Sequence, residues 1–363
     1  MAEKKKNTIY EVAEKAGVSR QTVSRVLNDR PDVSANTRKH VKQIIKDLNY
    51  RPNAIAQSLS RRKSKVLGVV TAGLRFIGPS RTLSGITSKA EELGYGLLIK
   101  ELSHFHTNDV QALLQWFLSH QVDGIIWAVP EIGENRVWLH DSHFDQKFPL
   151  VFLTMEPQKN LTVVSIDNYL GGRLAMSHLM DQEYHQIGHI AGPLEWWEAR
   201  QRMKAWGDVL NEAGIEIQDQ HWIAGNWSSA SGAAAMEKLL AQYPEMDSIF
   251  VANDQMALGV LQVIHQKGLS VPEDIGIVGF DNIPESAYFL PSLTSIQQDQ
   301  NKVAEVAVEE IIKIIKSGWQ GLEIIDPHSI LLEPTLVVRR SSLRHKGSKN
   351  KGGGVKISGM KKR

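Results

Sequence analysis

The sequence predicts a small all-α helix-turn-helix headpiece with a hinge helix, followed by a two-lobed α/β core with one parallel sheet in each lobe. Three observations predict this fold class. Residues 8–27 carry the start and stop signals of two short helices, residues 66–279 alternate between strand-like and helix-like periods, and charge is segregated along the chain. A chain of 363 residues is also too long for one ordinary core.

The first two helices are predicted from their end signals. Thr8-Ile-Tyr-Glu11 has the pattern of a capping box, and Gly17 tolerates the sharp turn that ends the first helix. Ser19 stands at an N-cap position for a second helix. The apolar stripe of that helix consists of Val23, Val26 and Leu27. Two short helices joined by a glycine-containing turn form a helix-turn-helix.

The polar side of the second helix is basic and has no acidic residue. Its candidate DNA-contacting residues are Ser19, Arg20, Gln21, Thr22, Ser24, Arg25 and Asn28. The start of this helix meets base edges in the motif, where Arg can bind guanine O6/N7 and Gln can bind adenine. A solvated helix face also carries such residues. The capping box and the turn glycine beside it favour DNA binding.

Charge segregation supports a nucleic-acid partner. Residues 1–65 carry 16 Lys/Arg against 6 Asp/Glu, and residues 339–363 carry 10 against none. The stretch 66–338 carries 16 Lys/Arg against 34 Asp/Glu, although the net charge of the chain is only +2. Basic ends on an acidic body are expected when only the ends attract phosphate.

A third helix and a hinge complete the predicted N-terminal region, which we divide into a headpiece at 1–52 and a hinge at 53–65. Ser34 caps the third helix, with Thr37 in its first turn, and Tyr50-Arg-Pro52 ends it. Residues 53–60 are too few for a stable helix in water. A helix that forms only when docked on DNA and on a second copy of the chain is therefore expected, and a plain linker is the alternative.

From residue 66 onward, strands and helices alternate, which indicates parallel sheets with helices on both faces. The first series has strands at 66–71, 97–99, 124–129 and 150–153 and helices at 80–93 and 110–118. The second series has strands at 163–166, 187–191, 248–252 and 275–279 and helices at 169–180, 198–213 and 255–267. We predict a first lobe at 66–162 with 293–323, and a second at 163–292 with 324–341.

Polar residues that follow strands are candidates for a ligand site, because ligands bind at strand carboxyl ends in such sheets. Asn253 follows the strand ending at residue 252, and Asp281 follows the strand ending near residue 280. Arg202 lies one turn into a helix, and Trp227 follows the strand-like segment 222–224 and could provide an aromatic face for a ligand. Each could instead be structural; Asp254, for example, could cap the helix that starts at Gln255.

Several functional classes lack their motifs. The chain has no cysteine, no G-x-S-x-G elbow, no Walker loop and no H-E-x-x-H pair, so we expect no enzyme and no cofactor. His104 with His106 and His140 with His143 could pair on a metal, but exposed histidines are more common, and no metal site is predicted. The basic start is followed by no apolar stretch, and no run of about 18 apolar residues occurs. A cytoplasmic protein is expected.

Residues 9–28, Ile-Tyr-Glu-Val-Ala-Glu-Lys-Ala-Gly-Val-Ser-Arg-Gln-Thr-Val-Ser-Arg-Val-Leu-Asn, resemble the headpiece of the lactose-repressor (LacI/GalR) family of bacterial regulators. The similarity continues at 33–34, 37–38 and 48–53, then at 251–259 and 278–282, and runs to about residue 340. It implies a core like that of periplasmic sugar-binding proteins. It also implies a homodimeric repressor that binds a pseudo-palindromic operator and is controlled by a saccharide or glycoside between the lobes.

The resemblance also assigns residues. It implies a hinge helix that places Leu59 in the minor groove, with Asn53, Ala56 and Gln57 also in the hinge. Thr8, Ser34 and Thr37 join the DNA-contacting set. The effector-binding positions that the family pattern implies are Phe76, Pro79, Thr154, Arg202, Trp227, Asn253, Asp281 and Gln298.

The chain departs from the family pattern in ways that leave the sugar open. Thr154 stands in place of an acidic residue, Ala72 in place of a hydroxyl side chain, and Gln300 in place of an aromatic ring. Glu195-Trp-Trp-Glu198 adds bulk near Arg202. Residues 342–363 form a Gly/Lys-rich basic tail without leucine heptads, for which we expect disorder and a dimer rather than a tetramer. A regulator that needs its ligand to bind DNA, and a hydrolase or sugar-binding protein with an added headpiece, are the alternatives.

Overall fold

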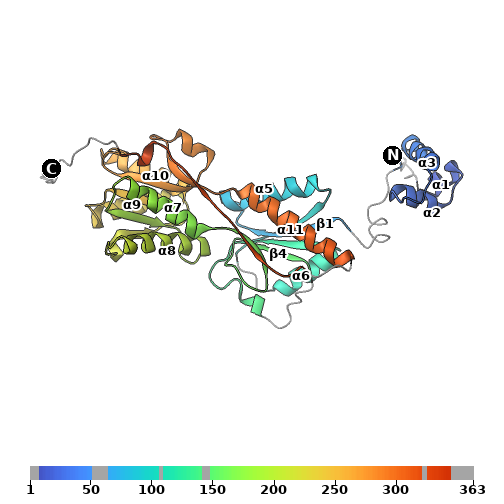
Figure 1. Cartoon of the computed structure of the whole chain (residues 1–363), viewed down its shortest axis with the longest axis horizontal. Helices are drawn as coiled ribbons and strands as arrows, with labels where there is room; N and C mark the ends of the chain where they lie inside the picture. Colours follow the sequence, from blue (N-terminus) through green and yellow to red (C-terminus); the bar gives the residue numbers. More distant parts are fainter. Residues whose placement is uncertain (1–7, 51–63, 106–108, 141–147, 321–324, 345–363) are drawn as a thin grey trace. The chain divides into compact units, whose positions relative to one another are not determined.

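A computed structural model gives the structure of the protein and describes residues 8–50, 64–105, 109–140, 148–320 and 325–344 (Figure 1). The chain divides into two units, residues 1–65 and residues 66–363. Within the described ranges, no helix has both the length and the apolar character needed to cross a membrane.

The N-terminal unit consists of three helices around a small core. These are α1 (Ile9–Ala16), α2 (Arg20–Leu27) and α3 (Ala35–Asp47). The buried side chains at their centre are Val12, Ala13, Ala16, Val23, Val26 and Val41. Helices of eight residues are not stable alone in water, so α1 and α2 depend on this shared core.

The ends of these helices have the capping interactions that the sequence predicts. The Thr8 N–H donates to Glu11 Oε2 at 2.8 Å, and the Glu11 N–H donates to Thr8 Oγ1 at 3.5 Å. Gly17 has a φ of 60°, the left-handed conformation that glycine adopts without strain. Ser19 Oγ and Ser34 Oγ each accept a backbone N–H three residues on, at 3.1 Å.

Thr8→Ala is expected to destabilise α1 by about 1 kcal/mol, because the Glu11 N–H loses Thr8 Oγ1 as its acceptor. In the full-length protein, amide hydrogen exchange of α1 should then be about fivefold faster. Thr8→Ser keeps the hydroxyl and should exchange like the wild type. Equal exchange in the alanine variant would show that the capping box does not stabilise this helix.

The first lobe of the second unit has a six-stranded parallel sheet. Its order is β11 (Ser329–Leu332), β5 (Thr162–Ile166), β4 (Leu150–Leu153), β3 (Gly124–Ala128), β1 (Val66–Ala72) and β2 (Gly96–Leu102). Leu67 and Val69 of β1 pack with α5 (Ile77–Glu92) and α11 (Gln300–Gln320), whereas Val70 packs with α6 (Val110–Ser119). The alternation of strand side chains thus buries both faces.

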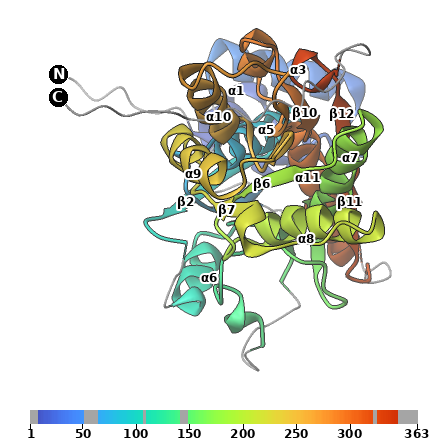
Figure 2. The same ribbon diagram turned by 90° about the vertical axis from the view of Figure 1, so that its left-hand side faces the viewer.

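The second lobe repeats this architecture. Its sheet has the order β12 (Thr335–Val337), β10 (Thr294–Gln297), β9 (Gly276–Asp281), β8 (Ser248–Val251), β6 (Ile187–Ala191) and β7 (Trp222–Ala224). Only the β10–β12 pair among these is antiparallel. Helices α9 (Ser229–Gln242) and α10 (Asp254–Gln266) cover one face, and α7 (Asn168–Asp181) and α8 (Trp197–Glu212) cover the other (Figures 1 and 2).

Helix α9 was absent from the predicted series, because its small residues give little apolar periodicity. Its backbone lies directly against α10 through two glycines. A Cβ at Gly232 would lie 2.2 Å from the Met256 carbonyl oxygen, and one at Gly259 would lie 2.0 Å from the Ser229 carbonyl oxygen. Larger side chains at either position would force the two helices apart.

The predicted lobe boundaries are wrong in three places. Strand 163–166 belongs to the first lobe, where β5 pairs with β4 and β11. Segment 293–323 divides between β10 in the second lobe and α11 in the first, and segment 324–341 divides between β11 and β12. The chain therefore crosses between lobes near residues 167, 298 and 333. Periodicity gives the order of the elements, but hydrogen bonds between distant strands decide which sheet each one joins.

The helix predicted to begin at residue 80 begins at Ile77 instead. Pro79 lies in its first turn, where a missing N–H costs no intrahelical hydrogen bond. This earlier start brings Phe76, the N-cap residue, to the carboxyl edge of the sheet.

Candidate functional site

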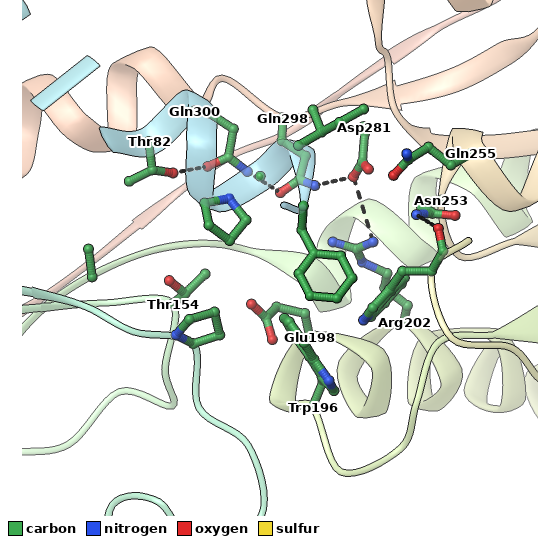
Figure 3. A pocket seen from close by; sticks show the side chains of 17 residues that line it. Thr82, Thr154, Trp196, Glu198, Arg202, Asn253, Gln255, Asp281, Gln298 and Gln300 are labelled. Atoms are coloured by element: carbon green, nitrogen blue, oxygen red, sulfur yellow. Dashed lines mark hydrogen bonds and ion pairs between the residues drawn. The ribbon is translucent and has the colours of Figure 1, made fainter. Parts of the chain in front are cut away.

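A pocket lies between the two lobes, at the carboxyl ends of the strands (Figure 3). It has about 700 Å³ of empty space when the volume on its open side is included. All eight effector-binding positions from the sequence line it: Phe76, Pro79, Thr154, Arg202, Trp227, Asn253, Asp281 and Gln298. The lining also includes Ile77, Gly78, Thr82, Ala128, Pro130, Trp196, Glu198, Gln255 and Gln300.

Arg202 is a buried cation at the second-lobe side of the pocket, with 4% of its surface exposed. Its Nε donates to Asn168 Oδ1 at 2.9 Å, and its guanidinium lies 3.6 Å from the Phe280 ring centroid. One guanidinium nitrogen lies 3.8 Å from Asp281 Oδ1. Burial lowers the pKa of Arg202, and the carboxylates near it act in the opposite direction. These contacts fix the guanidinium before any ligand binds.

Asp281 ends strand β9 and faces both Arg202 and Gln298. Its Oδ1 accepts a hydrogen bond from Gln298 Nε2. Burial raises the pKa of Asp281, whereas the positive charge of Arg202 and the bond from Gln298 lower it. A carboxylate next to a guanidinium can receive one hydroxyl of a ligand while the guanidinium donates to another.

A chain of polar side chains connects the two lobes along this edge of the pocket (Figure 3). Thr82 Oγ1 donates to Gln300 Oε1 at 2.8 Å, and Gln300 Nε2 donates to Gln298 Oε1 at 3.2 Å. Gln298 in turn donates to Asp281. Thr82 and Gln300 belong to the first lobe and Asp281 to the second, so a ligand that replaces one of these bonds acts on both lobes.

The N-cap residue of α10 is Asn253, and not Asp254 as the sequence suggested. Asn253 caps α10, because its Oδ1 accepts the Met256 N–H at 2.9 Å. Asp254 caps nothing: its carboxylate accepts from the Ile283 N–H and from the hydroxyls of Ser286 and Ser295, at 2.9, 2.5 and 2.6 Å. The helix starts one residue earlier than predicted, at Asp254, and this moves the cap to Asn253.

Aromatic rings form the opposite wall and join the lobes. Phe76 of the first lobe lies 5.7 Å from Trp196 of the second, edge to face, and Trp196 lies 5.8 Å from Trp227. Beside them, the Gly133 N–H donates to the Glu195 carbonyl oxygen across the lobes at 2.8 Å. The rings give the pocket an apolar wall.

Three residues of the lining have left-handed backbone conformations. The φ angles are 54° for Thr154, 73° for Trp227 and 107° for Asp281. Asp281 ends a strand and Thr154 and Trp227 come shortly after one, whereas helix ends account for positions such as Gln121 and Glu183. Non-glycine residues in this region cost about 1–3 kcal/mol each and tend to cluster at functional sites.

The predicted effector-binding set lacks four polar lining residues, Thr82, Glu198, Gln255 and Gln300. Gln255 comes directly after Asn253 and Asp254, shortly after strand β8. Its place after a strand could have identified it as a candidate for the ligand site. Glu198 belongs to the segment Glu195–Glu198 that adds bulk near Arg202, and Gln300 stands where the family pattern has an aromatic ring. Burial of the Glu198 carboxyl group is a tertiary effect that no local pattern predicts.

The predicted DNA-contacting residues of the helix-turn-helix fall into two groups. Arg20, Gln21 and Arg25 are exposed on α2, and Thr22 and Ser24 are half-buried. Ser19, Thr8 and Ser34 also cap helices, so they have structural roles.

Three of the predicted DNA-contacting residues have side-chain contacts within the headpiece. Arg20 lies over the Tyr10 ring at 4.4 Å, Arg25 pairs with Asp32 at 3.3 Å, and Asn28 Nδ2 donates to Ser24 Oγ at 3.3 Å. Half-buried Thr37 lies in the first turn of α3.

The hinge positions Asn53, Ala56, Gln57 and Leu59 lie outside the described residues, as does the tail from residue 345. His106 and His143 of the two histidine pairs are outside them as well. In the part of the chain that the structure describes, no three His, Asp or Glu side chains are grouped to hold a metal ion.

These features define a class of protein in which a helix-turn-helix unit precedes a two-lobed core with a pocket between the lobes. The family model for bacterial regulatory proteins of the lacI family matches residues 8–53, and the model for the periplasmic binding protein-like domain matches residues 176–342. The lactose operon repressor of Escherichia coli (strain K12) is 33% identical over 93% of this chain and 91% of its own length. The chain belongs to the LacI family of bacterial transcription regulators.

Other relatives are regulators as well. The transcriptional repressor PurR of Pasteurella multocida is 32% identical over 92% of this chain and 98% of its own. The catabolite control protein A of Priestia megaterium is 32% identical over 89% and 97%. The lac repressor dimer bound to operator and the anti-inducer ONPF superimposes with a TM-score of 0.81 at 32% identity, covering 93% of this chain and 100% of that one. The CelR–cellobiose complex gives 0.66 at 28%, covering 92% and 99%. The predicted family and fold class are confirmed.

Proposed function

We propose that this protein is a sequence-specific transcriptional repressor whose operator affinity is controlled by a small sugar or glycoside bound between the two core lobes. The observation that carries the proposal is the polar chain Thr82–Gln300–Gln298–Asp281, which spans both lobes at the edge of the pocket. The pocket and the lobe arrangement are thereby coupled. The protein acts in the cytoplasm at the nucleoid.

The DNA partner is a pseudo-palindromic operator bound by a homodimer. Support comes from the basic α2 surface and from the lac repressor, a relative whose structure is a dimer bound to operator. Two headpieces read half-sites about 34–36 Å apart, one turn of DNA. Arg20 and Gln21 contact base edges, and Arg25 supports the complex near the phosphates. The hinge residues 53–60, including Leu59, order when they dock at the operator centre.

The effector class follows from the polarity of the pocket. Four amide side chains line it, together with one Arg–Asp pair and an aromatic wall. Amides both donate and accept, which suits hydroxyl groups, and the aromatic wall suits the C–H face of a sugar ring. Related structures contain cellobiose or ONPG. A neutral saccharide or glycoside therefore matches this pocket best.

Release of DNA is a coupling between two sites. A sugar that binds one relative arrangement of the lobes more tightly than the other shifts the population toward that arrangement. The chain crosses between the lobes three times, and β1 of the first lobe directly follows the hinge segment in sequence. A change in the angle between the lobes therefore alters the surface of the core and the start of β1. Separation of the two hinge segments in the dimer then weakens operator binding.

The test is fluorescence anisotropy of the full-length protein with a symmetric operator duplex at one fixed salt concentration, with and without a panel of mono- and disaccharides. Tight binding that one sugar releases supports the proposal. Binding that requires an added ligand would show a co-repressor-dependent regulator instead. Absence of sequence-specific binding to a randomised duplex library would contradict the DNA-binding assignment.

Arg20→Ala and Gln21→Ala are each expected to relax base preference at one operator position, at a cost of about 1–3 kcal/mol for the preferred base. Non-specific binding should change little, because that depends on phosphate contacts. Selection from a randomised operator library measures the change, and Lys15→Ala, outside α2, provides the comparison. An equal loss on all sequences would show that these side chains contact only the backbone of DNA.

A further inference from the structure

Glu198 is a buried carboxyl group that lines the effector pocket and is not fully satisfied by the protein. It is the second residue of α8 and only 7% exposed. Its Oε2 is buried without a hydrogen-bond partner among the described residues. Figure 3 shows its carboxyl group extending from the α8 side toward the middle of the pocket. A buried acceptor without a donor costs free energy, so a donor on a ligand would be favoured there.

The charges around Glu198 indicate what kind of donor fits. Two arginines, Arg136 and Arg202, act on its carboxyl group through space, and Glu131 acts against them. Both arginines are buried, at 6% and 4% exposure. The two guanidinium groups already offset part of the charge of the carboxylate, so it does not need a cation from the ligand. A neutral hydroxyl group can supply the missing hydrogen bond.

The pKa of the Glu198 carboxyl group is also compatible with a neutral hydroxyl group on the ligand. Burial raises the pKa of Glu198 to about 7, and the helix N-terminal amide, Arg202 and Arg136 offset this only in part. A hydroxyl group both donates and accepts, so it can satisfy the carboxyl in either protonation state. An ammonium group can pair only with the ionised form.

We propose that Glu198 is a specificity-determining residue that accepts a hydrogen bond from a hydroxyl group of a neutral saccharide, on the side of the pocket opposite Asp281. The inference rests on the proposed function and deepens it. Asp281 with Arg202 holds one end of the sugar, and Glu198 selects a hydroxyl at the other.

Isothermal titration of the full-length protein tests this directly, without DNA. The ligands are glucose, galactose, cellobiose and lactose, with glucosamine and galactosamine as cationic counterparts. The variants are Glu198→Leu, which removes the acceptor, and Glu198→Gln, which keeps a carbonyl acceptor but no charge. Glu195→Leu and Glu195→Gln are the matched controls, because Glu195 is exposed three residues earlier and does not line the pocket.

The expected result is that a neutral sugar binds the wild type, that Glu198→Leu weakens it at least tenfold, and that Glu198→Gln weakens it less. The Glu195 variants bind like the wild type. A monodeoxy analogue that lacks the selected hydroxyl should bind the wild type and Glu198→Leu equally, which separates a direct contact from a structural effect. Thermal unfolding of each variant verifies the fold.

Three outcomes would overturn the inference, and they are distinguishable. Wild-type affinity in Glu198→Leu would show that the carboxyl does not contact the sugar, and the proposed function would stand. Preference for an amino sugar, lost equally in the leucine and glutamine variants, would assign an ammonium ligand instead of a hydroxyl. Binding of no sugar to the wild type would reject the sugar effector itself, and the specificity role with it.

Discussion

Asp281→Ala is expected to leave operator binding intact and to abolish release at the sugar concentrations that release the wild type. The variant loses the carboxylate that lies beside Arg202 and accepts from Gln298. Charge-assisted hydrogen bonds contribute about 1.5–3 kcal/mol, so sugar affinity should fall about 10- to 150-fold. Arg202 keeps its contacts with Asn168 and the Ala252 carbonyl, so the lobe should remain folded. Titration of sugar into the operator complex, followed by anisotropy, measures the response.

The matched control for this variant is Asp219→Ala, an exposed aspartate of the same lobe outside the pocket lining. It should release operator at the wild-type sugar concentration. Asp281→Asn retains an acceptor for Gln298 but loses the charge, and an intermediate response is expected. Normal release in Asp281→Ala would remove this residue from the effector site.

Asp254→Ala is expected to destabilise the core by about 3–5 kcal/mol. Its carboxylate is fully buried and accepts three hydrogen bonds, from the Ile283 N–H, Ser286 Oγ and Ser295 Oγ. Alanine would leave these donors buried without an acceptor, at about 1–3 kcal/mol each, although the two hydroxyls can rotate to other partners. For a unit of this size the midpoint of thermal unfolding, Tm, should fall by about 10 °C.

Asp254→Asn provides the comparison, because it keeps one acceptor oxygen in a side chain of the same shape. A smaller loss of stability is expected for it. Differential scanning calorimetry of the full-length protein can resolve the core transition. An unchanged Tm in Asp254→Ala would mean that the loop at 281–286 is held by contacts other than this carboxylate.

The helix-turn-helix could be predicted almost completely, because its signals are local. The Thr8–Glu11 capping box, the Gly17 turn and the Ser19 cap each depend on residues within four positions of one another. The effector candidates were also within reach of the sequence. Residues that follow parallel strands meet at one edge of a sheet, and the resemblance to a family named the eight positions that line the pocket.

The sequence by itself determined the headpiece, the alternation of strands and helices, and the polar character of the pocket. Only the tertiary structure decided which sheet β5, β10 and β11 join, because strand pairing depends on distant partners. It also decided that Asn253 caps α10 while Asp254 binds a remote loop. Burial of Glu198 without a partner arises only when both lobes enclose it. Local patterns encode local hydrogen bonds, whereas desolvation and long-range pairing are properties of the assembled core.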